Sequence, residues 1–309
     1  MAQDKPIIVV AVGGNALLQR GELMSYENQA NNIDIASKAL AELSENYRVV
    51  VVHGNGPQVG LLALQNLAYT DAPPYPLDVL GAETQGMIGY MMARSLKKYL
   101  KNGHVSTVVT QIAVDQSDPA FDAPNKFIGP VYDKETAQEK SAQYGWDIKP
   151  DGDYWRRVVP SPFPQGIIEI DSIRTLLDAG HTVICCGGGG CPVVEKEGEM
   201  TGVEAVIDKD FSAATLAKQL NAQHLLILTD GDYVCVDWGK PTEQPLYDVT
   251  VEQVQQYSFA AGSMAPKVEA CCDFAAYTKG AGATGIGHIG SLHKTAEIMA
   301  NRSGTHIHG

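Results

Sequence analysis

A repeated order of apolar strand, glycine- or aspartate-containing loop and helix constrains the fold of this 309-residue chain most strongly. The order occurs four times, and each short run of β-branched and aliphatic residues leads directly into its loop. The four runs are IIVVAV (7–12), RVVVVH (48–53), HTVICC (181–186) and HLLILT (224–229). Short, almost wholly apolar strands suit a parallel sheet that is covered on both faces. The chain is therefore predicted to be α/β, an open three-layer αβα sandwich with a mostly parallel central sheet.

The loops that follow three of these runs are rich in glycine. They read GGN (13–15), GNG (54–56) and GGGG (187–190), and the fourth loop reads DGD (230–232). In open α/β sheets, ligands bind beyond the carboxyl ends of the strands. Glycine lets the backbone approach a ligand closely, and the N-terminus of the next helix offers free N–H groups. One such loop alone is usually a tight turn, whereas several in one sheet favour an anion site.

The segments between the runs carry helical periodicity. Ile33, Ala36, Leu40 and Leu43 fall on one stripe at a period of 3.6. The sequence GAGATG (280–285) matches G-x-G-x-x-G, but it follows a helix-like stretch and precedes a strand-like one, so we interpret it as a helix-to-strand loop. Walker, G-x-S-x-G and H-E-x-x-H motifs are absent from the sequence.

Composition limits the classes of partner. There are 23 Lys and Arg against 36 Asp and Glu, a formal net charge of −13, which argues against nucleic acid and anionic membranes as partners. We expect a cytoplasmic protein, because no apolar run has the length of a membrane span and the first lacks the flanks of a signal peptide. The six cysteines lack C-x-x-C spacing, and the expectation is reduced thiols with no metal site. The C-terminal HIHG is interpreted as a solvated tail.

The stretch from about residue 112 to 164 differs from the rest. Its apolar periodicity fades, and Pro, Asp, Lys and Tyr cluster in it. The prediction is a small subdomain that protrudes from the main sheet; the alternative is a long surface insertion without a ligand role.

Three lysines stand beside Gly, Pro or apolar residues: Lys126 in PNKFIGP, Lys209 in VIDKD and Lys267 in GSMAPK. A single lysine is usually a solvated surface group. Phosphoryl transfer, however, needs cations and donors around the moving phosphoryl group, and lysines held by a carboxylate supply them.

Eight segments together resemble the carbamate kinases of the amino acid kinase family, and the closest resemblance is to a divergent carbamate kinase-like subgroup. They are VGGNALL, VHGNGPQVGLL, TQGMIGY, WRRVVPSPFP, CCGGGGCPVV, GVEAVIDKD, LILTDGDYV and FAAGSMAPKVEA, spread in family order from the first strand to about residue 270.

The resemblance implies one domain over 1–309 and a homodimer. A small-substrate lobe (1–195) would carry the protruding subdomain (112–164), and a nucleotide-binding lobe would follow (196–309). The implied reaction is ATP + carbamate ⇌ ADP + carbamoyl phosphate, with Mg²⁺ accompanying ATP or ADP, used mainly to make ATP.

The resemblance also implies roles for single residues. Lys209 and Lys267 would bind phosphate, and Asp210 would orient them. Asp208 would lie next to these residues without contacting the phosphate itself. Lys126 would reach the site from the subdomain. The small substrate would lie on Gly13, Gly14, Asn15, Gly54, Asn55 and Gly56, and the nucleotide on Lys209, Asp230, Tyr233, Met264 and Lys267. No protein-bound metal is implied.

The chain departs from the family pattern in two places. It reads APNKF (123–127) where relatives commonly read NPTKP, and KPDGDYWR (149–156) where they read EDAGRGWR. The departures are Asn125, Phe127 and Asp153, all expected near the small substrate. Two alternatives stay open: a kinase for another small carboxylate or carbamoyl compound, and a nucleotide-binding, non-catalytic member of the fold.

Overall fold

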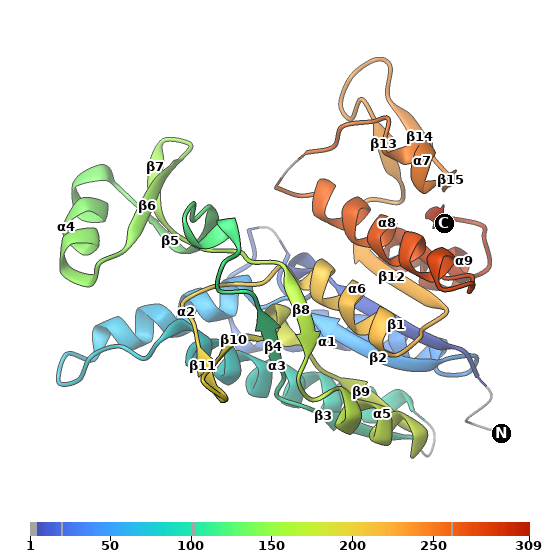
Figure 1. Cartoon of the computed structure of the whole chain (residues 1–309), viewed down its shortest axis with the longest axis horizontal. Helices are drawn as coiled ribbons and strands as arrows, with labels where there is room; N and C mark the ends of the chain where they lie inside the picture. Colours follow the sequence, from blue (N-terminus) through green and yellow to red (C-terminus); the bar gives the residue numbers. More distant parts are fainter. Residues whose placement is uncertain (1–4, 20, 101–102, 261) are drawn as a thin grey trace.

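An eight-stranded sheet runs through the centre of the molecule (Figure 1). The computed structural model describes residues 5–19, 21–100, 103–260 and 262–309, without the side chain of Asn15. In spatial order the strands are β15 (Asp248–Thr250), β17 (Thr305–His308), β16 (Ile286–Ser291), β12 (His224–Thr229), β1 (Ile7–Val12), β2 (Arg48–His53), β9 (His181–Ile184) and β3 (His104–Thr107). The last six of these are mutually parallel, whereas β17 pairs antiparallel with β16.

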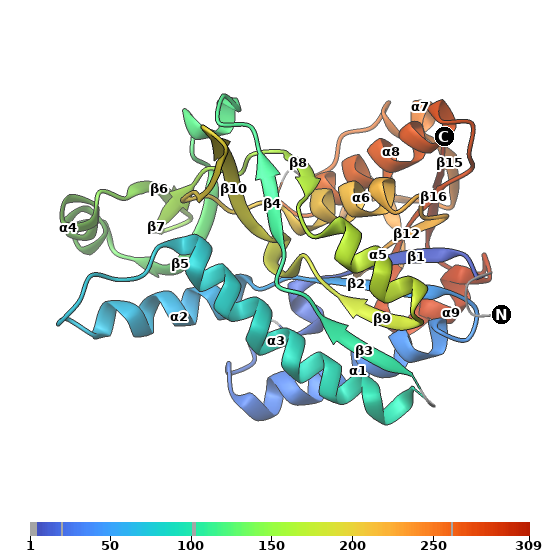
Figure 2. The same ribbon diagram turned by 60° about the horizontal axis from the view of Figure 1, so that its bottom comes forward.

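Helices cover both faces of this sheet. One face packs against α1 (Tyr26–Leu43), α3 (Leu77–Tyr99) and α9 (Thr295–Met299), and the other against α5 (Ile170–Asp178), α6 (Lys209–Gln219) and α8 (Ala265–Gly280) (Figure 2). Successive residues of β1 alternate between the two cores: Val9 and Ala11 lie in one, and Val10 and Val12 in the other. The predicted three-layer αβα sandwich is confirmed.

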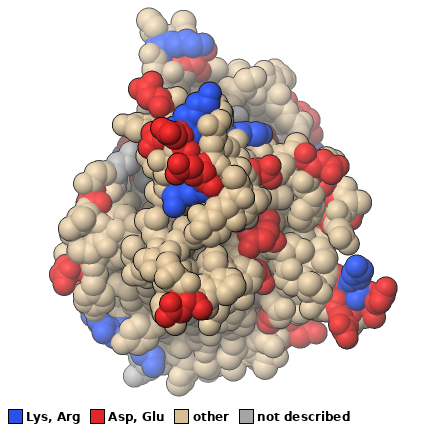
Figure 3. All heavy atoms as spheres, turned by 90° about the vertical axis from the view of Figure 1, so that its left-hand side faces the viewer, with Lys and Arg blue, Asp and Glu red and all other residues tan. Residues whose placement is uncertain are grey.

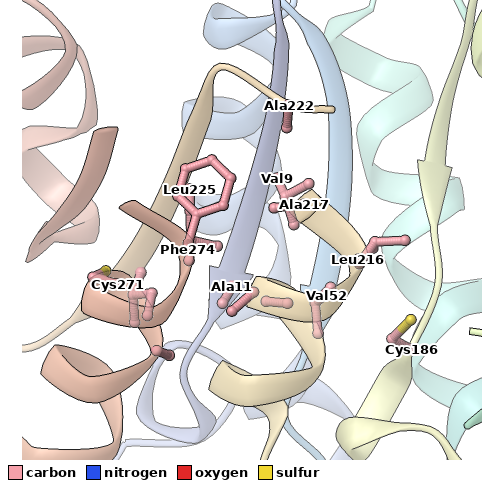
Figure 4. Packing of buried hydrophobic residues seen from close by; sticks show 14 of the residues in the cluster. Val9, Ala11, Val52, Cys186, Leu216, Ala217, Ala222, Leu225, Cys271 and Phe274 are labelled. Atoms are coloured by element: carbon pink, nitrogen blue, oxygen red, sulfur yellow. The ribbon is translucent and has the colours of Figure 1, made fainter. Parts of the chain in front are cut away.

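The core under α6 and α8 is built from small and medium side chains. Val9 and Ala11 of the sheet face Ala217 of α6 and Phe274 of α8, which is fully buried (Figure 4). On the opposite face, the predicted stripe of α1 (Ile33, Ala36, Leu40 and Leu43) is buried as expected. Periods of 2 in strands and 3.6 in helices therefore place the apolar side chains correctly.

A second, smaller sheet lies beside the first and carries the protruding subdomain. Its order is β11 (Glu199–Gly202), β10 (Cys191–Lys196), β4 (Gln111–Val114) and β8 (Pro164–Ile167). Between β4 and β8 the chain leaves the body and forms β5 (Lys126–Tyr132), α4 (Lys134–Tyr144), β6 (Asp147–Asp151) and β7 (Tyr154–Val159) (Figure 1). The protruding subdomain is thus present, and the ends of the predicted excursion, 112–114 and 164, belong to the second sheet.

The remaining elements are one longer helix, which packs against β5 and α3, and several short segments. They are the helix α2 (Gly56–Ala68), the short helix α7 (Val251–Val254), the hairpin β13 (Val234–Val236) and β14 (Gln244–Leu246), and four 3₁₀ turns, η1 (Gly14–Ala16), η2 (Pro119–Phe121), η3 (Gly187–Gly189) and η4 (Leu292–Lys294). The GAGATG segment joins α8 to β16, as predicted. None of the described helices combines the length and apolar character that crossing a membrane requires.

The C-terminal HIHG is not a solvated tail, so that prediction is wrong. Residues 305–308 form β17, an inner strand of the main sheet, and His306 is buried. Its imidazole meets that of His288 (Nδ1 to Nδ1, 2.8 Å), and His288 meets His224 (Nε2 to Nδ1, 3.0 Å). Within the described residues, no group of three or more His, Cys, Asp and Glu is placed to hold a metal ion.

Candidate functional site

A cavity of about 810 Å³ opens at the carboxyl ends of β1, β2, β12 and β16. The loops that follow these strands form its floor, the N-terminal turns of α6 and α8 form one wall, and the subdomain contributes another. Its polar and glycine lining includes Gly13, Gly14, Gly54, Asn55, Gly56, Lys126, Arg156, Gly188, Asp208, Lys209, Asp210, Asp230, Gly262, Ser263, Lys267, Ser291 and His293. The position matches the edge at which open parallel sheets bind ligands.

The triplet Asp208–Lys209–Asp210 forms the N-terminus of α6. Asp208 is the N-cap, and its Oδ1 accepts a hydrogen bond from the backbone N–H of Asp210 at 3.0 Å. A side-chain oxygen at this position satisfies a backbone donor that the helix leaves open, and negative charge is favourable there. The capping residue therefore begins the helix at the rim of the cavity and sets Lys209 and Asp210 in its first turn.

Asp210 holds two lysines from different helices. Lys209 Nζ lies 2.5 Å from its Oδ1, and Lys267 Nζ, from the first turn of α8, lies 3.1 Å from its Oδ2. The Asp210 side chain is 2% exposed, whereas both lysines line the cavity. One buried carboxylate between two ammonium groups leaves a net positive charge, and it fixes the positions of both ammonium groups. The structure thus brings together three of the four predicted catalytic residues.

Lys126, the fourth, reaches the cavity from β5 of the subdomain. Its Nζ lies 2.8 Å from Asp208 Oδ2, so Asp208 caps α6 with one oxygen and holds the subdomain lysine with the other. Burial would raise the pKa of the Asp208 carboxyl, but the charges of Lys126 and Lys209 oppose this and bring the pKa down to about 2. Asp208 is therefore a carboxylate at any physiological pH.

At two of the cavity glycines, an added side chain would clash with its neighbours or crowd them. Gly188 has φ +67°, and a Cβ placed there would lie 2.1 Å from the Asn55 amide nitrogen. A Cβ on Gly54 would lie 3.3 Å from the backbone nitrogen of Gly14. Asn55 itself donates to Thr84 Oγ1 at 2.7 Å. Backbone atoms therefore form much of the cavity floor, and the hydrogen bond to Thr84 fixes the Asn55 side chain.

His53, at the end of β2, was not singled out from the sequence. Its Nδ1 donates to the Gly54 carbonyl at 2.9 Å, and burial, which disfavours the imidazolium form, lowers the pKa of the imidazole to about 4. The neutral ring holds the Gly54 peptide in place from below. Its signal in the sequence was the histidine directly before GNG.

The other predicted residues divide into those that line the cavity and those that do not. Asp230 and Met264 line it, whereas Tyr233 packs edge-on against Tyr247 with ring centroids 5.1 Å apart and does not appear in the lining. Asn15 follows Gly14 in the 3₁₀ turn that borders the cavity, but its side chain lies outside the described part of the structure.

Of the three departures from the family pattern, Phe127 alone borders the cavity. Asn125 precedes β5, and Asp153 lies in the turn between β6 and β7; neither is part of the lining. The expected position beside the small substrate therefore stays a prediction for Asn125 and Asp153.

Comparison with known proteins bears on the family. The amino acid kinase family model matches residues 6–279. A carbamate kinase of Escherichia coli O6:H1 is 52% identical over 300 residues, covering 97% of this chain and 98% of that protein. One of Thermococcus kodakarensis is 43% identical over 314 residues, with coverage of 97% and 98%. The structure of the carbamate kinase from Giardia lamblia bound to AMP-PNP superposes with a TM-score of 0.92 at 38% identity, covering 99% of each chain. The chain belongs to the amino acid kinase family.

Proposed function

We propose that this protein is a carbamate kinase that catalyses ATP + carbamate ⇌ ADP + carbamoyl phosphate. The observation that carries the proposal is the buried Asp210 carboxylate. It holds Lys209 and Lys267, which lie in the first turns of α6 and α8, at the cavity. The similarity to carbamate kinases over nearly the whole chain supports the same reaction.

In the forward direction, a carbamate oxygen attacks the γ-phosphorus of ATP. A new P–O bond forms, the bond from that phosphorus to the β,γ-bridging oxygen breaks, and ADP leaves. Negative charge is spread over the transferring oxygens, and the ammonium groups of Lys209 and Lys267 stabilise it, as does that of Lys126. A unit charge pair about 4 Å apart is worth roughly 4 kcal/mol at an effective dielectric of about 20.

The two substrates would approach from opposite lobes. We place carbamate or carbamoyl phosphate in the 1–195 lobe, on the backbone of Gly13, Gly14 and Asn15 and of residues 54–56. The nucleotide would lie in the 196–309 lobe against Asp230 and Met264, which line the cavity, and would reach Tyr233 beyond the lining. The subdomain within about 112–164 would cover the small substrate. Support comes from the cavity, which joins the two sets of loops in one continuous space.

Mg²⁺ would enter as the complex with ATP or ADP. This cation needs only one or two carboxylates when phosphates and water supply its other ligands. Asp230 lines the cavity at the end of β12 and offers oxygen of the right kind. The ion would neutralise phosphate charge during transfer.

We further propose that the enzyme is a cytoplasmic homodimer that works mainly toward ATP. The formal net charge of −13 disfavours nucleic acid and anionic membranes as partners. Small anionic substrates would be attracted by the cations that line the cavity.

The test is ATP formation by the purified protein from carbamoyl phosphate, ADP and Mg²⁺. Acetyl phosphate at the same concentration is the control for substrate identity, and omission of ADP is the control for simple hydrolysis. ATP formation with carbamoyl phosphate well above that with acetyl phosphate supports the proposal. Absence of ATP formation with carbamoyl phosphate would overturn it.

One observation favours a second candidate, a kinase for another small carboxylate or carbamoyl compound. Phe127 stands in the lining beside Lys126, at a position where the sequence departs from the family pattern. An apolar ring there could favour a larger acyl group. Faster ATP formation from a larger acyl phosphate than from carbamoyl phosphate would identify this candidate. A non-catalytic nucleotide-binding protein, the remaining alternative, would bind ADP but turn over none of these compounds.

A further inference from the structure

The subdomain brings a second cation to the cavity besides Lys126, and it is Arg156 of β7. We propose that Arg156 binds the phosphate group of the small acyl phosphate substrate and so acts as a determinant of affinity for that substrate. This inference rests on the proposed function and adds to it a residue that the sequence did not point out.

The base of the Arg156 side chain is held by its own subdomain. Its Nε donates to the Gly129 carbonyl at 2.8 Å, and its Nη1 lies 3.3 Å from Asp151 Oδ2. Gly129 has φ +68° and stands where the register of β5 against β7 shifts between Ile128 and Val131. Such a bulge redirects the backbone locally, and here it turns a carbonyl toward the guanidinium. The side chain is therefore oriented before any substrate arrives.

The outer end of the same guanidinium remains available. Within the described residues, the hydrogen bonds of Arg156 involve Nε and Nη1, and none involves Nη2. The side chain is 32% exposed and borders the cavity. Since a guanidinium presents its N–H donors as a planar fork, the free end can donate to phosphate oxygens while the base stays attached to the strand.

Charge balance singles out Arg156 among the groups that the subdomain brings to the cavity. The ammonium of Lys126 is paired with Asp208 at 2.8 Å, and that carboxylate belongs to the same cavity. The partner of Arg156, Asp151, is 36% exposed and 3.3 Å away, and it does not line the cavity. An exposed pair at this distance is weak. Toward the substrate, the subdomain thus presents its positive charge mainly through Arg156.

Its neighbour, Arg157, provides a matched control. Successive residues of a strand point to opposite faces, and Arg157 turns away from the large cavity. It pairs with Glu204 at 2.6 Å and stacks on Trp146 at 4.8 Å from the ring centroid, beside a separate small apolar pocket. The two arginines share strand, charge and size, but differ in what they face.

The first experiment measures binding without turnover. Phosphonoacetamide, in which a CH₂ group replaces the bridging oxygen of carbamoyl phosphate, is titrated calorimetrically into wild type, Arg156→Met and Arg157→Met. Loss of a charged hydrogen-bond donor should weaken binding by roughly 10- to 100-fold for Arg156→Met. Arg157→Met loses the ion pair with Glu204 but no donor that faces the cavity, so it should lose clearly less affinity than Arg156→Met. Equal affinity of Arg156→Met and wild type overturns the inference.

The second experiment separates substrate affinity from folding. In the ATP-forming direction, Arg156→Met should raise the KM for carbamoyl phosphate while the KM for ADP stays nearly unchanged, and Arg156→Lys should recover part of the loss. Arg174→Met, on the exposed surface of α5, is a further control. A rise in the KM for carbamoyl phosphate as large in Arg157→Met as in Arg156→Met would show an effect of subdomain folding and would overturn the inference. If wild type forms no ATP, the proposed function fails; if wild type is active and Arg156→Met is normal, only this inference fails.

Discussion

At the scale of single residues, three neighbours in sequence have three different tasks. Asp208 ends an irregular segment by capping α6 and also holds Lys126, whereas Lys209 and Asp210 occupy the first turn. Asp210 then joins α6 to α8 through Lys267. The N-terminal ends of two helices, which carry the positive ends of the helix dipoles, therefore meet where phosphates are proposed to bind.

The phosphate-ligand role of the two lysines predicts a large loss on removing either one. Lys209→Ala and Lys267→Ala should each lower turnover by roughly 10²- to 10³-fold, the usual cost of losing one charge contact in the transition state. Steady-state ATP formation and far-UV circular dichroism measure activity and folding. Lys218→Ala is the matched control, since Lys218 lies on the same helix and pairs with Asp273 at 2.6 Å outside the cavity. Near-normal turnover in both variants would reject the assignment.

The organising role of Asp210 makes a different prediction. Asp210→Asn keeps the size of the side chain but removes the charge between two ammonium groups, which then repel each other. We expect turnover to fall severely and ADP binding, measured by calorimetry, to change with it. Asp273→Asn, which removes the carboxylate from the Lys218 pair, should leave both quantities near those of wild type. Parental binding and turnover in Asp210→Asn would show that another group holds the lysines.

At the scale of secondary-structure elements, the subdomain is attached to the body by ion pairs as well as by its two chain connections. Lys126 of β5 pairs with Asp208 at 2.8 Å, and Arg157 of β7 pairs with Glu204 at 2.6 Å. The subdomain projects from the second sheet, away from the main core (Figure 1). A small unit that is attached in this way can move as a cover without disturbing the central sheet.

The cover predicts a substrate-specific defect. Lys126→Ala should raise the KM for carbamoyl phosphate and lower turnover, while ADP affinity stays nearly unchanged, because the nucleotide lysines lie on α6 and α8. Hydrogen exchange within 115–163 should slow when phosphonoacetamide and ADP are added together. Lys149→Ala, an exposed lysine of β6, is the control and should behave as wild type. Unchanged exchange together with an active Lys126→Ala would reduce the subdomain to a surface insertion.

At the scale of the whole molecule, two features have consequences: the distribution of charge on the surface and the histidines buried inside. Acidic residues are scattered over the face seen in Figure 3, and the basic ones are fewer. Anionic substrates are therefore attracted by the cations that line the cavity and not by the surface as a whole. Inside the molecule, His288 and His53 are buried, and both have a lowered pKa, chiefly because burial disfavours the charged imidazolium.

Buried neutral histidines predict loss of stability on acidification. The unfolded chain, with imidazole pKa near 6.5, binds protons that the folded protein does not, so stability is present above pH 6.5 and falls below it; for His53 the loss continues to about pH 4. Each such histidine contributes a slope of up to about 1.4 kcal/mol per pH unit. Urea unfolding between pH 7.5 and 5 measures the slope.

The variant His288→Asn should lower that slope by up to about 1.4 kcal/mol per pH unit, the contribution of one proton. The variant His104→Asn, which removes an exposed imidazole, should not change the slope. A wild-type free energy of unfolding that is constant over this pH range would contradict the prediction.

The sequence by itself determined the layers of this protein. The runs at 7–12, 48–53 and 224–229 became strands with the predicted bounds, because a period of 2 or of 3.6 is a local property that the backbone enforces. HTVICC ended early, at Ile184, since Cys186 takes the left-handed conformation (φ 51°) as the chain turns toward the glycine loop. The sequence and its family resemblance also predicted Lys209, Asp210 and Lys267 as site residues, and the structure brings these three together.

Only the tertiary structure decided which groups meet. Asp208 and Lys126 stand 82 positions apart, and neither local sequence predicts their contact. Arg156 and Arg157 are neighbours of the same type in the sequence, and the packing of β7 decides that Arg156 borders the cavity and that Arg157 borders the small apolar pocket. The HIHG segment is polar, but pairing with β16 buries it. In each case the deciding free energy comes from partners that are distant along the chain, so a local sequence pattern does not predict the outcome.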